Sequence, residues 1–162
     1  MAIAMMSWLL AIPLLGFTTG LRSLTPMAVL CWYAYLEYLP VSGTWAEWTG
    51  RLGVAIAFTV LAVGELIGDK SPRIPDRTSP LPLLARVCLG GLAGSIAATA
   101  MDGPGIEGVL LGIVGALLGA FVGFMVRRDL VEKIGCKDWQ IGVVEDLCAI
   151  IFAAFALHVV TA

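Results

Sequence analysis

The chain has 162 residues, of which 59% are hydrophobic and only 14% are charged, and its net charge at pH 7 is −2. Soluble domains carry about a quarter charged residues, so this composition and the mean hydropathy of +0.94 exclude an ordinary soluble domain. The net charge is uninformative by itself, because the placement of charges matters more than their sum in a membrane protein, and nothing in the sequence indicates nucleic-acid binding. We expect one membrane domain over residues 1–162, with the lipid bilayer as its main partner.

The apolar residues fall into six blocks, each bounded by Gly, Pro or a cluster of charges. Most blocks are close to the 17 to 25 residues, roughly, that a helix needs to cross the hydrocarbon of a bilayer. We therefore predict an all-α fold, a bundle of six transmembrane helices. The predicted helices cover about residues 2–21, 26–41, 50–68, 81–101, 107–126 and 141–161.

The first two blocks need separate interpretation. Residues 2–21 lack a basic n-region and a small-residue cleavage site, so we interpret them as a retained helix and not as a signal peptide. Residues 26–41 are barely long enough to span and contain Glu37, so they form either a short span or one arm of a re-entrant hairpin. Pro26 suits the first turn of a helix, where exposed N–H groups can bind an anion.

Lysine and arginine side chains indicate the orientation, because they concentrate in the cytoplasmic loops of membrane proteins. If all six blocks span, Arg51 lies alone on one side of the membrane and nine basic residues lie on the other. Those nine are Arg22, Lys70, Arg73, Arg77, Arg86, Arg127, Arg128, Lys133 and Lys137. We therefore predict that their side is cytoplasmic and that the N- and C-termini lie outside.

Glycines recur at a spacing of four residues, as within residues 16–20, 90–94 and 115–123. This spacing lets membrane helices approach closely. The glycine-rich faces serve either packing within the chain or a homodimer or other small homo-oligomer. The short sequence of residues 15–20 is similar to that of residues 89–94. This similarity predicts two inverted three-helix repeats, as in many transporters.

Charged residues at the predicted cytoplasmic ends of the helices form the candidate site. A charge inside a span is costly unless it is paired or hydrated, so it usually faces the bundle interior. Glu65 and Asp69 lie four residues apart, on one helix face, and Glu145 begins the last block on the same side. The candidate substrate- or ion-binding residues are Arg22, Glu65, Asp69, Lys70, Arg73, Asp76, Arg86, Glu145 and Asp146.

Several chemistries fit these residues. Carboxylates can hold Mg²⁺ or another hard cation, so a divalent cation is a candidate cofactor with Glu65, Asp69, Asp76 and Asp146 as its candidate ligands. Arginines can grip a phosphate or a carboxylate, and acids with bases can relay protons beside a transported solute. The same charges can also do no more than join helices through salt bridges.

The motifs resemble a family of small bacterial inner-membrane proteins that is classed only as a domain of unknown function. The resembling elements are Gly20-Leu-Arg22 with Pro26, Glu65-x3-Asp69-Lys70-x-Pro72 with Asp76, then Arg86, and finally Glu145-Asp146. They occur in the right order over most of the chain. The resemblance implies a multi-pass protein of the bacterial inner membrane, and it implies no activity.

These observations leave three functions open. The first is a small transporter or channel for a small solute or ion, with a polar site near the cytoplasmic face. The second is a metal-dependent enzyme that acts on a membrane lipid phosphate, and the third is a non-catalytic membrane scaffold. No familiar catalytic motif occurs in the sequence, and acids alternate with basic residues, so we predict no catalytic residue and favour transport.

Overall fold

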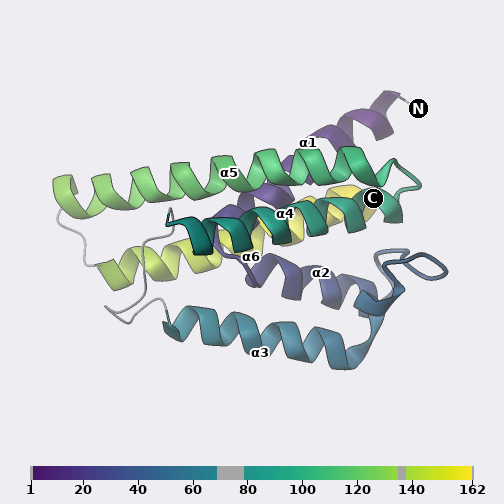
Figure 1. Ribbon diagram of the computed structural model, residues 1–162, viewed down its shortest axis with the longest axis horizontal. Coiled ribbons are helices and arrows are strands. Elements are labelled where there is room, and N and C mark those ends of the chain that lie inside the picture. The colour runs from purple at the N-terminus through teal and green to yellow at the C-terminus, as the bar shows by residue number, and fades with distance from the viewer. Residues whose placement is uncertain (1, 69–78, 135–137, 162) are drawn as a thin grey trace.

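The computed structural model describes residues 2–68, 79–134 and 138–161 (Figure 1). No strand occurs in these ranges, and this confirms the predicted all-α class. The elements are α1 (Ala2–Leu21), α2 (Thr25–Tyr35), the 3₁₀ turn η1 (Glu47–Gly50), α3 (Leu52–Gly68), α4 (Pro80–Ala100), α5 (Gly105–Asp129), the π-helical turn η2 (Leu130–Ile134) and α6 (Asp138–Thr161).

Three helical stretches are long and apolar enough to cross a membrane, namely Pro80–Ala100, Gly105–Lys133 and Gln140–Thr161. Large apolar side chains also cover the outward faces of the helices, and Leu110 and Leu118 of α5 are examples. A continuous exposed apolar surface marks contact with lipid or with another protein. The structure therefore indicates a membrane protein.

Successive helices run in opposite directions, so α1, α3 and α5 end where α2, α4 and α6 begin (Figure 1). We call this end of the bundle the basic end and the opposite end the cap end. Within the described ranges, Arg51 is the one lysine or arginine at the cap end. The basic end holds Arg22, Arg86, Arg127, Arg128 and Lys133.

Glycines bring α1, α4 and α5 into close contact. A Cβ atom added at Gly112 of α5 would overlap the backbone of Gly90 in α4. One added at Gly16 of α1 would overlap the backbone of Gly112, and Gly94 and Gly108 exclude a Cβ from each other in the same way. The glycine-rich faces of these three helices therefore pack against one another within the chain, as the four-residue spacing allows.

The second helix is shorter than its predicted range of 26–41, because it ends at Tyr35. Glu37 adopts a φ of 62°, which takes the backbone into the left-handed region and out of the helix. Pro40 then blocks any continuation. With 11 residues, α2 is about 16 Å long and cannot cross a membrane by itself.

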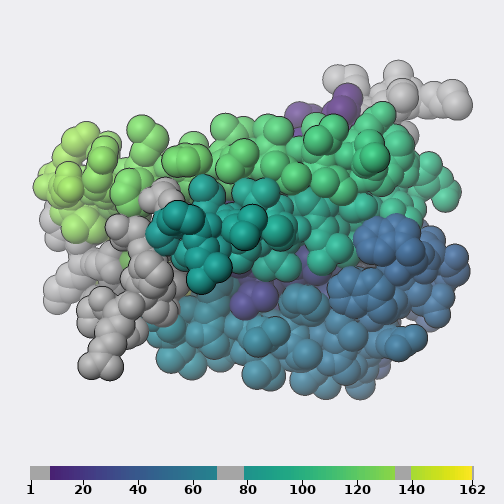
Figure 2. Space-filling model, in the orientation of Figure 1, coloured from purple at the N-terminus to yellow at the C-terminus, as the bar shows by residue number. Residues whose placement is uncertain are grey.

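Residues 36–51 form a compact segment, which we call the cap, between α2 and α3. Leu39, Val41 and Ala46 of the cap are buried in the apolar core. The indole Nε1 of Trp45 donates a hydrogen bond to Thr99 Oγ1 of α4 at 3.0 Å. Figure 2 shows the cap lying against the end of the α4–α5 pair. Non-helical backbone can lie at membrane depth where protein buries it in this way.

The two halves of the chain pack differently. α5 lies between α1 and α4 and contacts both along much of its length, whereas α2, its counterpart in the first half, packs mainly against α3 and α6. The helix packing therefore offers no support for the inverted repeat that the short sequence match indicated.

Replacing Gly112 with Ala should destabilise the bundle by about 1–3 kcal/mol, because the added methyl group would overlap the backbone of α4. The matched control is Gly64→Ala in α3, where an added Cβ meets open space. The thermal unfolding midpoint of the detergent-purified protein should fall for Gly112→Ala and not for Gly64→Ala. Equal midpoints for the two variants would contradict this account of the packing.

Candidate functional site

The turn between α1 and α2, residues 22–24, is the centre of the basic end. α1 ends at Leu21 and α2 begins at Thr25, so the carbonyl end of one helix lies beside the N–H end of the next. The last carbonyls and the first N–H groups of helices have no partner within their own helix. This turn therefore needs both a donor and an acceptor from elsewhere in the chain.

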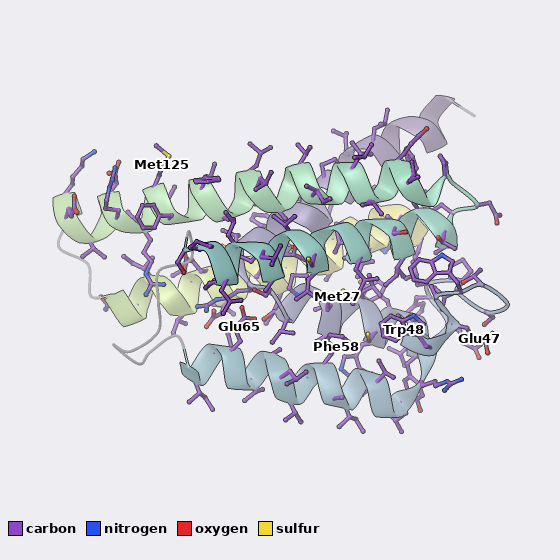
Figure 3. All side chains as sticks on the ribbon, in the orientation of Figure 1. Met27, Glu47, Trp48, Phe58, Glu65 and Met125 are labelled. Carbon is purple, nitrogen blue, oxygen red and sulfur yellow. The ribbon has the colours of Figure 1, made fainter. Side chains whose placement is uncertain are left out.

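Glu65 of α3 supplies the acceptor. Its Oε1 accepts the backbone N–H of Ser23 and its Oε2 accepts the N–H of Leu24, each at 2.8 Å. Figure 3 labels Glu65 on the side of α3 that faces the rest of the bundle. A negative charge at this position also interacts favourably with the helix dipole of α2. The anion that Pro26 led us to expect at the start of the second helix is thus a side chain of the protein itself.

Arg86 of α4 supplies the donor. Its Nη1 donates hydrogen bonds to the carbonyl oxygens of Gly20 at 2.7 Å and Leu21 at 2.9 Å. These are the last two carbonyls of α1, where the helix dipole favours a cation. The Arg86 side chain is only 4% exposed, so a full positive charge is held inside the bundle by this contact.

Arg22 connects the same turn to α6. Its Nε lies 2.6 Å from Asp146 Oδ1, and its Nη2 lies 3.5 Å from the carbonyl oxygen of Gly142. Arg22 is 2% exposed and the Asp146 side chain is 15% exposed, so this ion pair is largely shielded from solvent. Buried charges of this kind are stable only when they are paired.

The structure brings four of the predicted site residues to the turn from four elements. Arg22 lies in the turn itself, while Glu65, Arg86 and Asp146 come from α3, α4 and α6. Glu145 pairs with Arg127 of α5, at 3.5 Å. The remaining candidates, Asp69, Lys70, Arg73 and Asp76, lie outside the described residues.

Sequence reasoning missed the contributions of the main chain. Glu65 binds Ser23 and Leu24 through backbone N–H groups, and Arg86 binds backbone carbonyls, so no residue pattern identifies these partners. The signal that was available is Pro26, which marks the start of a helix and hence a set of free N–H groups. Arg127 was used only to predict the orientation and was not among the candidate site residues, although it pairs with Glu145.

Metal binding finds limited support in this geometry. In the part of the chain that the structure describes, no group of three or more His, Cys, Asp and Glu side chains could hold a metal ion. Both oxygens of Glu65 accept N–H groups, and Asp146 faces the Arg22 guanidinium. The other two candidate ligands, Asp69 and Asp76, are not among the described residues.

Fold and site together define a helical membrane protein in which charged side chains from several helices meet at one interhelical turn. A family model for a domain of unknown function, DUF4126, matches residues 9–161, and the chain belongs to this family. This confirms the resemblance to an uncharacterised family. No curated protein and no solved structure matches the chain.

Replacing Arg22 with Met should lower the free energy of unfolding by about 3–5 kcal/mol, because it removes a buried partner from Asp146. Combining Arg22→Met with Asp146→Leu should cost much less than the sum of the two single changes, since no unpaired charge then remains. Thermal midpoints in detergent provide the measurement for this double-mutant cycle.

The exposed pair of Lys133 and Asp129 at the end of α5 provides the control for that cycle. Lys133→Met should change stability by less than about 1 kcal/mol, because surface ion pairs contribute little. Additive effects of the Arg22 and Asp146 substitutions would show that their contact does not stabilise the bundle.

Proposed function

We propose that the protein is a small membrane transporter or channel for a small solute or ion, and that the α1–α2 turn is its polar site. The observation that carries the proposal is the burial of two arginines, Arg22 and Arg86, in a bundle whose core is built from apolar residues and a few threonines. Ionisable side chains within membrane helices are costly, and they characteristically mark the pathways of ions and solutes.

The helix termini at this turn support the same function. Many secondary transporters bind substrates where helices are interrupted, because the ends of helices present N–H and C=O groups that a polar solute can bind. Here α2 has 11 residues, and its N-terminus lies beside the C-terminus of α1. Glu65 and Arg86 hold these ends through hydrogen bonds that a polar solute can exchange for its own.

The alternative functions have less support. The carboxylates of Glu65 and Asp146 already have hydrogen-bonding or ionic partners, which does not favour a metal-dependent enzyme that uses them as ligands. A scaffold does not need buried charges, because well-packed apolar residues often stabilise a protein as much as a buried ion pair does. Transport gives these charges a role that apolar residues cannot fill.

We also propose a topology, in which the six helices lie across the bacterial inner membrane with the basic end in the cytoplasm and both termini outside. The concentration of lysine and arginine at one end of the bundle supports this orientation. The short helix α2 and the cap together take the place of one complete span.

Reporter fusions test the topology. Alkaline phosphatase is active only after export, so it should be active when it is inserted after Gly43 in the cap or joined to the C-terminus. The same reporter joined after Lys133, at the basic end, should be inactive. The reverse pattern of activities would overturn the proposed orientation, and activity at all three positions would contradict the six-helix arrangement.

Flux through liposomes tests the proposed function. Currents on a solid-supported membrane should appear when the purified protein is exposed to concentration jumps of at least one solute in a panel of Na⁺, K⁺, protons, phosphate and acetate. Glu65→Gln should change that current roughly tenfold or more, because a hydrogen bond to a charged group is worth about 1.5–3 kcal/mol.

Glu47→Gln is the matched control for this assay. Glu47 also accepts a hydrogen bond from a backbone N–H group, that of Gly43 at 3.1 Å, but this bond is exposed and lies in the cap. Its replacement should leave the current unchanged. An unchanged current in folded Glu65→Gln protein would exclude Glu65 from the site. Folded wild-type protein that moves none of the five solutes would favour the scaffold.

A further inference from the structure

The third helix is attached to the bundle less tightly than α1, α4 and α5, the three helices that pack through their glycines. α3 packs mainly against α2 and η1, and Ala55 and Ala62 are its buried residues. An added Cβ at Gly53 or Gly64 would meet open space, whereas one at Gly90 or Gly112 would overlap a neighbouring helix. Figures 1 and 2 show α3 along one edge of the molecule.

Apolar contacts anchor α3 at the cap end, and a hydrogen bond joins its middle to α2. Thr49, just before the helix, is fully buried, and Ala55 in its first turn is also 0% exposed. The ring centroids of Trp48 in the cap and Phe58 in α3 lie 6.5 Å apart, and Figure 3 labels both residues. In the middle of the helix, Trp32 Nε1 of α2 donates a hydrogen bond to Thr59 Oγ1 at 2.9 Å.

At the basic end, the attachment is polar. Val63, Gly64 and Ile67 are exposed and Leu66 is half-buried, while the Glu65 carboxylate accepts hydrogen bonds from the N–H groups of Ser23 and Leu24. Hydrogen bonds can be exchanged for bonds to water or to a solute, which offset most of the energy lost, whereas the buried apolar contacts at the cap end have no such substitute. The two ends of α3 therefore differ in how easily they separate from the bundle.

We propose that α3 is a gate that pivots at the cap end and that Glu65 is the latch that closes it at the basic end. Release of the Ser23 and Leu24 N–H groups lets the last turns of α3 move away from α2, which opens the Arg22–Asp146 pair to a solute. This inference rests on the proposed transport function for its purpose, but the movement itself is measured independently of transport.

Distances between spin labels test the gate. One label replaces Ile67 of α3 and the other Met125 of α5, two exposed residues towards the basic end, in protein whose native cysteines are replaced by alanine. The reference pair of labels replaces Leu84 of α4 and Met125 of α5. Both are exposed residues on helices that pack together through glycines. A swing of about 10° by this helix of roughly 25 Å moves its end by about 4 Å, which pulsed electron paramagnetic resonance resolves.

Glu65→Gln is the test variant, because its amide group offers one acceptor oxygen in place of two and carries no charge. We expect it to add an Ile67–Met125 population about 4 Å or more from the wild-type distance, while the Leu84–Met125 distance is unchanged. Glu47→Gln, the cap control, should change neither distance. The same Ile67–Met125 distribution in Glu65→Gln and wild type would overturn the proposal.

A loss of the Leu84–Met125 distance would show that Glu65→Gln does not fold. Glu65→Asp then replaces it as the test variant, because its shorter side chain retains the charge but cannot reach both N–H groups. A new Ile67–Met125 population in this variant would support the gate, and an unchanged distribution would overturn it. Movement of α3 without flux in any variant would leave the gate standing and reject the transport function. Flux that depends on Glu65, without movement of α3, would reject the gate alone.

Discussion

The pairing of helix ends with charged side chains at the α1–α2 turn is the constraint on which the rest of the structure depends. In lipid, a backbone N–H or C=O group without a partner costs several kcal/mol, because no water is present to bind it. The C-terminus of α1 and the N-terminus of α2 meet at this turn, so the cost of unpaired backbone groups would arise at both helix ends. Glu65 and Arg86 remove it from α3 and α4, and Arg22 extends the connection to α6 through Asp146. One turn thus links α1 and α2 to three further helices.

Two kinds of packing surround this turn and give the molecule parts of different rigidity. Glycine contacts hold α1, α4 and α5 so closely that a single methyl group at Gly112 has no space. α3 is held instead by apolar burial at the cap end and by the Glu65 carboxylate at the basic end. A rigid frame beside a unit with an exchangeable polar contact is an arrangement in which a membrane protein can open on one side only, and this connects the packing to the proposed transport.

Residue by residue, the candidate site shows how far sequence reasoning reached. Helix periodicity and alternating helix direction placed Arg22, Glu65, Arg86 and Asp146 at one end of the bundle, and the structure brings all four to the same turn. The partners were not predictable, because Glu65 and Arg86 bind main-chain groups that every residue type carries. The predicted end of α2 was wrong by several residues, because Glu37 adopts a left-handed conformation that residues other than glycine rarely take.

The sequence by itself determined that this protein is helical, that it belongs in a membrane and which family it joins. Composition and block length decide the first two points. In lipid, a long apolar segment has to pair its own backbone N–H and C=O groups, and a helix does so within the segment. The tertiary structure alone decided that the glycine-rich faces of α1, α4 and α5 pack within one chain, that residues 36–51 form a cap on the apolar core, and which charge meets which helix end. A helical pattern specifies the face that a side chain occupies, but the neighbour across that face depends on how all the helices pack together.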